Sequence, residues 1–130
     1  MKASVTFESL RVFQASKTLC LSVYPFTFKL PLSKDFALID QIRRSAGSIM
    51  DNIAEGYERG GNKELIQFLF IAKGSAGELR SQIIRAKELG YLAQEDATLL
   101  YENALAVSKM LSAYITYLKR SDFKGPKYTP

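Results

Sequence analysis

The feature that most constrains the fold is a repeat of small and apolar residues between positions 41 and 64, in the segment QIRRSAGSIMDNIAEGYERGGNKE. Steps of three and four residues separate its members, which is the spacing that places side chains on one side of an α-helix. These members are Ile42, Ala46, Ile49 and Ile53. The residues at 45–48 have small side chains, so the middle of the segment is narrow and we expect a neighbouring backbone to come close there. The segment predicts a helix packed within a bundle.

The same spacing recurs in three other parts of the chain. One stripe runs from Val12 to Val23, a second from Leu65 to Ala86 and a third from Ala97 to Leu118. Short connections between consecutive helices favour antiparallel neighbours. We therefore predict an all-α, antiparallel up-and-down four-helix bundle. Its helices span about 9–24, 35–57, 62–88 and 94–119, with breaks at roughly 29–34, 57–62 and 89–94, a bundle domain at 1–120 and a flexible tail at 121–130.

Particular residues predict where the helices begin and end. Ser9 is a good N-cap for the first helix, and Asn62 is a good N-cap for the third. Pro25 lacks an N–H and crowds the preceding turn, so we expect the first helix to kink or stop near Tyr24. Gly90 suits the position after the third helix, because glycine tolerates the left-handed conformation found there.

The chain contains no histidine, and this single fact excludes most enzyme classes. Ser-His-Asp and Cys-His catalytic groups need a histidine, as do the Glu-x-x-His pairs of di-iron bundles. Cys20 is the single cysteine, so a zinc site and an intramolecular disulfide are both excluded. We expect Cys20 to be a small buried residue rather than a reactive thiol. The sequence therefore predicts no enzyme activity, no metal and no cofactor.

Hydropathy and charge bear on location and partners. No apolar run approaches the roughly 20 residues that span a bilayer, and residues 1–13 lack the apolar region of a signal peptide. We expect a cytoplasmic protein without membrane contact. Lysine and arginine number 18 against 13 acidic residues, for a net charge of +5. This excess permits contact with phosphate groups but does not require it.

The third and fourth helices carry more apolar side chains than one bundle interior can hide. Phe68, Phe70, Tyr101, Met110 and Tyr117 lie beside the stripes and cannot all point inward with them. Surplus apolar surface of this kind marks a contact with a partner. A symmetric homo-oligomer is the simplest way to cover it.

Three segments in the expected order resemble one known family. They are FESLRVFQAS, QIRRSAGSIMDNIAEGYERG and KELIQFLFIAKGSAGELRSQIIRAKELGYL, and the similarity extends over about 7–119. The chain is similar to the four-helix bundle proteins encoded by intervening sequences within bacterial 23S rRNA genes, which also carry a ribosomal-protein-like label. This resemblance implies an up-and-down bundle that assembles as a ring of five. It carries no catalytic residues.

That family is in turn similar, more distantly, to the accessory protein of diversity-generating retroelements. The accessory protein is a basic pentameric bundle that works with a reverse transcriptase and nucleic acid. The relation implies contact with RNA or DNA. The chain departs from the family pattern at Met50 and Asp51, where proline and serine are common. Without that proline we expect a straighter second helix.

Two groups of polar residues are candidate sites. We interpret Asn52, Glu55 and Glu78 as a structural network, buried or half-buried, in which Arg43 or Arg44 neutralises the carboxylates, because buried charges persist only when paired. We explain Gly74 and Gly77 by close helix packing, since no phosphate-loop motif accompanies them. The candidate phosphate contacts are Arg43, Arg44, Arg59, Lys63, Arg80 and Lys87.

Two function classes remain open from the sequence. The first is an oligomer that binds nucleic acid, RNA above all, through phosphate contacts. The second is a protein-interaction scaffold, a ring that presents a surface to a protein partner without touching nucleic acid. A steep fall of affinity with salt distinguishes the first from the second.

Overall fold

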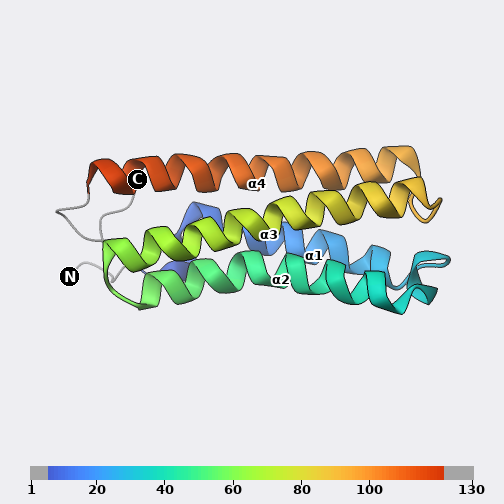
Figure 1. Ribbon diagram of the computed structural model, residues 1–130, viewed down its shortest axis with the longest axis horizontal. Helices are drawn as coiled ribbons and strands as arrows, with labels where there is room; N and C mark the ends of the chain where they lie inside the picture. Colours follow the sequence, from blue (N-terminus) through green and yellow to red (C-terminus); the bar gives the residue numbers. More distant parts are fainter. Residues whose placement is uncertain (1–5, 122–130) are drawn as a thin grey trace.

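Four antiparallel α-helices form the part of the chain that the computed structural model describes, residues 6–121. They are α1 (Arg11–Thr27), α2 (Phe36–Glu58), α3 (Asn62–Glu88) and α4 (Gln94–Arg120), with short 3-10 helices at Phe7–Ser9 and Leu32–Lys34. Figure 1 shows the helices running side by side along the long axis, each reversing the direction of the one before. The described range contains no β-strand. The predicted all-α four-helix bundle is confirmed.

The apolar stripes form the core, because each faces the bundle axis. Residues at steps of three and four along α2, α3 and α4 are fully excluded from solvent, among them Ile49, Leu69 and Leu111. Burying side chains of this size contributes about 1.5–3 kcal/mol each. Tyr57 at the end of α2 is also fully buried and closes the core at the α2–α3 turn.

Helix α1 differs from its prediction at both ends. Ser9 lies in the first 3-10 helix and donates to the carbonyl of Thr6, so α1 begins after it, with Leu10 at the N-cap position. Pro25 lies inside α1, and the helix continues to Thr27. A proline in the last turn removes one hydrogen bond near an end where bonds are already missing, so the helix is not broken there. The predicted stop near Tyr24 is therefore too early.

Asn62 is not the N-cap of α3, contrary to the sequence prediction. Gly61 holds that position, and Asn62 is the first helical residue, with only 8% of its surface exposed. Its amide nitrogen donates to the carbonyls of Leu118 (3.2 Å) and Ser121 (3.4 Å). Carbonyls at the end of a helix lack intrahelical donors. Asn62 therefore joins the start of α3 to the end of α4.

The α3–α4 connection follows its prediction. Gly90 has a positive φ of 81° and follows Leu89, the C-cap residue of α3. The Gly90 N–H donates to the Lys87 carbonyl, and the Tyr91 N–H donates to the Ala86 carbonyl. This pair of bonds is the Schellman arrangement that closes a helix with glycine.

Helices α2 and α3 come close at Gly56, and also at the small residues of the middle of α2, where Ser48 meets Ser75. A Cβ on Gly56 would stand 2.6 Å from the Cβ of Phe68. By contrast, a Cβ on Gly47 or Gly74 would meet nothing within 4 Å, and one on Gly77 would meet only the far end of Arg80. The explanation of Gly74 and Gly77 by close packing is therefore wrong. At Gly56 the α3 side chain of Phe68 is too close for a Cβ, so glycine is required there.

Candidate nucleic-acid interface

Helices α2 and α3 each carry a polar stripe with the same spacing as the apolar stripes of the core. On α2, positions i, i+3, i+4 and i+7 are Gln41, Arg44, Ser45 and Ser48. On α3, the equivalent positions are Glu78, Ser81, Gln82 and Arg85. Residues at this spacing share one helix face. The two stripes run along neighbouring antiparallel helices and line one polar groove of about 590 Å³.

Two arginines border this groove without strong partners of their own. Arg44 pairs with Asp40 at 3.0 Å, but both side chains are largely exposed, at 80% and 62%. Exposed pairs of this kind contribute little and exchange readily with solvent. Arg85 donates to the side-chain oxygen of Gln41 at 3.2 Å, which is a neutral acceptor. Both guanidinium groups therefore remain able to receive an anion.

Gln82 lies at the floor of the groove. Only 8% of its surface is exposed, yet its Oε1 atom has no hydrogen-bond partner among residues 6–121. A buried acceptor without a donor costs about 1–3 kcal/mol. Ser45, at 5% exposure, lies beside it on the α2 side of the groove. The groove therefore has a buried polar floor in which the Oε1 atom of Gln82 lacks a donor from the described residues.

A serine pair closes the groove toward the α2–α3 turn. The hydroxyls of Ser48 and Ser75 lie 2.8 Å apart and connect the two helices. Asn52 donates to the carbonyl and the hydroxyl of Ser48, at 2.8 and 2.9 Å. These contacts fix the spacing of the helices at that end.

The expected network of Asn52, Glu55 and Glu78 is not brought together. Asn52 bonds to Ser48, whereas Glu55 is exposed and pairs with Arg59 at 2.8 Å. Glu78 is exposed and lines the polar groove. The physical reason is that both carboxylates turn outward, where water solvates them and no buried counter-charge is needed. The Ser48, Ser75 and Asn52 contacts take the network's place.

Arg43 faces a different side of the bundle from Arg44. Its Nε donates to the Thr27 hydroxyl at 2.9 Å, and its guanidinium lies 4.5 Å from the centre of the Phe28 ring and 5.6 Å from that of Tyr24. Contacts between a guanidinium and an aromatic face are attractive. Arg43 therefore holds the end of α1 against α2, and it is half-buried in doing so.

Arg59 and Lys63 lie at the α2–α3 turn, at the end of α2 opposite to Arg43. Both are exposed. Arg59 pairs with Glu55 and also lies over the Phe68 ring, 5.1 Å from its centre. No ion pair between Lys63 and another described residue is formed. These two cations are separated along the helices from Arg44 and Arg85.

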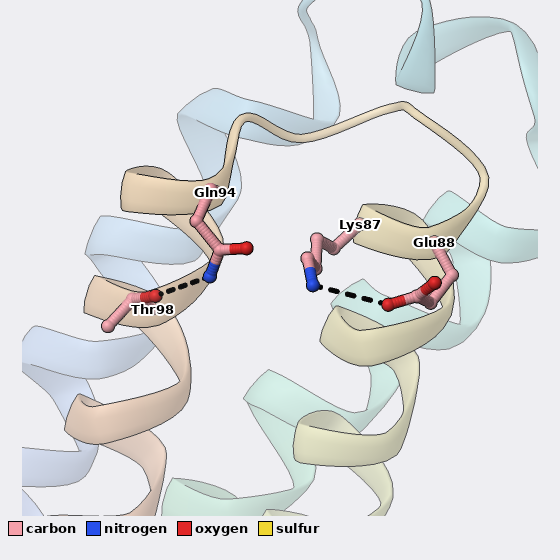
Figure 2. Close-up of polar contacts among 4 residues, drawn as sticks. All are labelled: Lys87, Glu88, Gln94 and Thr98. Atoms are coloured by element: carbon pink, nitrogen blue, oxygen red, sulfur yellow. Dashed lines mark hydrogen bonds and ion pairs between the residues drawn. The ribbon is translucent and has the colours of Figure 1, made fainter.

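Arg80 and Lys87 share the side of α3 that faces α4. Arg80 lies 5.9 Å from the Tyr101 ring centre, and its buried Nη1 has no hydrogen-bond partner among the described residues. Lys87 contacts the Glu88 carboxylate at 3.2 Å, and Figure 2 shows its side chain beside the α3–α4 connection, near Gln94. Both residues are half-buried. The six predicted cations therefore lie at four separate places on the bundle and do not form one patch.

The α2–α3 groove was missed in the sequence, although a signal for it is present. Arg85 and Gln82 are not among the candidate residues predicted from the sequence, because those candidates came from the apolar repeats and the charged residues. The signal is the polar repeat at i, i+3, i+4 and i+7 in both helices. Two matching polar stripes on consecutive antiparallel helices are what a shared polar groove requires.

A second hollow, of about 320 Å³, lies between the start of α1 and the last turns of α4. Its lining is largely apolar and includes Val12, Met110 and Tyr117. Tyr114 contributes a buried hydroxyl that has no partner among the described residues, and burial raises the pKa of this group above its ordinary value. The hollow holds no acid–base pair.

The described residues show no other chemical centre. No three carboxylate or cysteine side chains in residues 6–121 gather closely enough to hold a metal ion. Cys20 is buried and free, and burial raises the pKa of its thiol. A raised pKa lowers the reactive thiolate fraction. In the same range, no helix combines the length and the hydropathy that a bilayer crossing requires.

The fold and this site define a four-helix bundle with one polar, solvent-facing groove. The family model described as "23S rRNA-intervening sequence protein" matches residues 8–113. The chain belongs to this family, which confirms the resemblance found in the sequence. The predicted relation to retroelement accessory proteins stays a prediction.

A solved structure supports the fold. It is the crystal structure of a protein with unknown function from the S23 ribosomal protein family of Bacteroides thetaiotaomicron. It shares 24% identity with this chain, covers 78% of this chain and 95% of its own, and superposes with a TM-score of 0.72. No curated protein matches the chain. Neither the family description nor the similar structure indicates a catalysed reaction.

Proposed function

We propose that the protein is a non-enzymatic homo-oligomer that binds RNA through phosphate contacts from its helix faces. The observation that carries the proposal is the set of exposed cations on the hairpin of α2 and α3, above all Arg44, Lys63 and Arg85. The net charge of +5 supports it. So does the family description, which names an intervening sequence of 23S rRNA.

The intramolecular contacts of the six predicted cations indicate how much each can contribute to RNA affinity. Arg44 and Lys63 are exposed, so they reach a phosphate without losing a buried contact. Arg43, Arg59 and Arg80 each lie over an aromatic ring of the same chain, so part of their role is structural. Lys87 is half-buried beside Glu88. We expect Arg44 to contribute most to RNA affinity among the six, with Lys63 contributing less.

Assembly as a pentamer belongs to the same proposal. Apolar side chains remain exposed on α3 and α4, such as Phe70 (47%), Ile71 (51%) and Leu99 (56%). A contact with further copies would cover such surface. Five copies of a chain with net charge +5 would carry about +25 and attract a polyanion strongly. Light scattering at micromolar concentration should give the mass of five chains, and a monomer would remove this part of the proposal.

The RNA proposal is tested by the salt dependence of binding. Fluorescence anisotropy with a labelled single-stranded RNA should show the association constant falling roughly tenfold or more between about 50 and 200 mM salt. Each phosphate contact contributes about −0.7 to the slope of log K against log salt. Absence of binding at about 50 mM salt, or affinity that does not change with salt, would refute RNA binding through phosphates.

A protein-interaction scaffold is the second candidate, and a specific surface favours it. The connection between α1 and α2 exposes Phe28 (69%) and Leu30 (70%), and the first residue of α2, Phe36, is exposed beside it (75%). Apolar side chains gathered in this way fit the apolar surface of a protein partner. Binding of a partner that persists at high salt and disappears on replacing Leu30 and Phe36 with serine would favour this function.

A further inference from the structure

We infer that the groove between α2 and α3 is the site that binds the ribose–phosphate backbone of RNA. In this site, Arg44 and Arg85 contact phosphate oxygens, and Gln82 hydrogen-bonds the ribose 2′-hydroxyl. The inference rests on the proposed RNA binding and goes further, because it selects one face of the molecule and one residue that distinguishes RNA from DNA.

The rim of the groove supplies the phosphate contacts. Its two guanidinium groups come from facing helices, Arg44 from α2 and Arg85 from α3. Either arginine could turn toward a phosphate without leaving a buried charge behind. The present partner of Arg44, Asp40, is 62% exposed, and the present partner of Arg85, Gln41, is neutral and exposed. Arginine also presents paired N–H groups that match two oxygens of a phosphate.

The floor of the groove supplies an independent observation. Only 8% of the surface of Gln82 is exposed, and no described residue donates a hydrogen bond to its Oε1 atom. Gln82 also lines the groove, and a change of its side-chain rotamer would turn the amide toward it. A phosphodiester offers no hydrogen-bond donor, whereas a ribose 2′-hydroxyl both donates and accepts. An RNA backbone therefore satisfies this amide, and a DNA backbone does not.

Glu78 determines which end of the groove the RNA phosphates occupy. It borders the groove two helical turns before Arg85, and its carboxylate repels phosphate. The phosphates should therefore lie at the Arg44 and Arg85 end, away from Glu78. Removing the charge of Glu78 should strengthen RNA binding, which is not expected if phosphates bind elsewhere on the bundle.

The arginines are tested with variants of equal charge change. Anisotropy titrations compare R44A/R85A with R59A/K63A, whose cations lie at the α2–α3 turn. R44A/R85A should weaken RNA binding at least about tenfold and make the salt slope shallower by about 1.4, for two lost contacts. R59A/K63A should change both values less. Light scattering and circular dichroism check that each variant keeps its assembly and its helices.

Gln82 and Glu78 are tested by their effects on RNA and on DNA of the same sequence. The wild type should prefer RNA, and Gln82→Met should lower RNA affinity about threefold to tenfold while leaving DNA affinity unchanged. Glu78→Gln should raise RNA affinity about twofold to fivefold, whereas Glu64→Gln, at the other end of α3, should have a smaller effect.

The outcomes separate the inference from the function on which it rests. RNA binding that R44A/R85A leaves intact and R59A/K63A abolishes would overturn the groove while keeping the proposed function. Equal affinity of the wild type for RNA and DNA would overturn the role of Gln82. A changed oligomer mass in R44A/R85A with unaltered RNA affinity would make the groove a contact between copies. Absence of RNA binding by the wild type would refute the proposed function itself.

Discussion

Gly56 and Gly74 are both helical glycines, but their surroundings differ. A methyl group on Gly56 would overlap the Cβ of Phe68 on α3, at 2.6 Å, whereas one on Gly74 would meet nothing within 4 Å. The atom that it would meet at position 56 lies next to the backbone and cannot swing aside as the end of a long side chain can. Gly56 is therefore required by packing, and Gly74 is not.

This contrast predicts opposite effects of one substitution. Gly56→Ala should lower the free energy of unfolding by about 1–3 kcal/mol, because the two helices must separate. Gly74→Ala should raise it by about 0.5–1 kcal/mol, since alanine favours the helix and meets no clash. Urea denaturation followed by circular dichroism measures both. Equal stability of the two variants would contradict the packing of α2 against α3 described here.

At the scale of helices, side-chain hydrogen bonds at both ends of the bundle connect residues that lie 56 positions apart in the sequence. Asn62 connects the start of α3 to the last carbonyls of α4. At the opposite end, Asp35 caps α2 by accepting the Leu38 N–H and also accepts the Tyr91 hydroxyl, at 3.1 Å each. The hydrogen bond to Asp35, together with burial, raises the pKa of Tyr91.

Asn62 therefore should matter more than a surface asparagine. Asn62→Ala should lower the free energy of unfolding by about 1–2 kcal/mol, because the helix-end carbonyls lose their donor. Asn62→Asp should lower it further, since a carboxylate would face carbonyl oxygens. The control is Asn103→Ala on the exposed side of α4, which should stay within about 0.5 kcal/mol of the wild type. An Asn62→Ala protein as stable as this control would contradict the role given to Asn62.

The sequence predicted the helices well and their ends less well. Apolar spacing is a local property, and it placed the four helices and the core side chains such as Ile49 and Leu111. The role of Asn62 depends on the end of α4, 56 residues away, which no local pattern reveals. The rotation of α2 and α3 about their axes, fixed only by packing, turns Glu55 and Glu78 to solvent and brings Gln82 and Arg85 into a groove.

For the whole molecule, the decisive property is how its positive charge is distributed. The cations do not form one continuous patch: Arg43 lies against α1, Arg80 and Lys87 face α4, and Arg44 and Arg85 border the α2–α3 groove. The separate faces therefore differ in their affinity for a polyanion. The groove differs from the other faces because its two arginines come from facing helices and neither lies over an aromatic ring, and because the unsatisfied Oε1 atom of Gln82 lies beside them.

Ultraviolet crosslinking of the bound RNA, followed by mass spectrometry of the crosslinked peptides, tests this account most directly. Crosslinks should concentrate on the two facing segments 41–48 and 78–85, and excess unlabelled RNA should remove them. Crosslinks confined to α4, or to the exposed connection around Phe28 and Phe36, would contradict it.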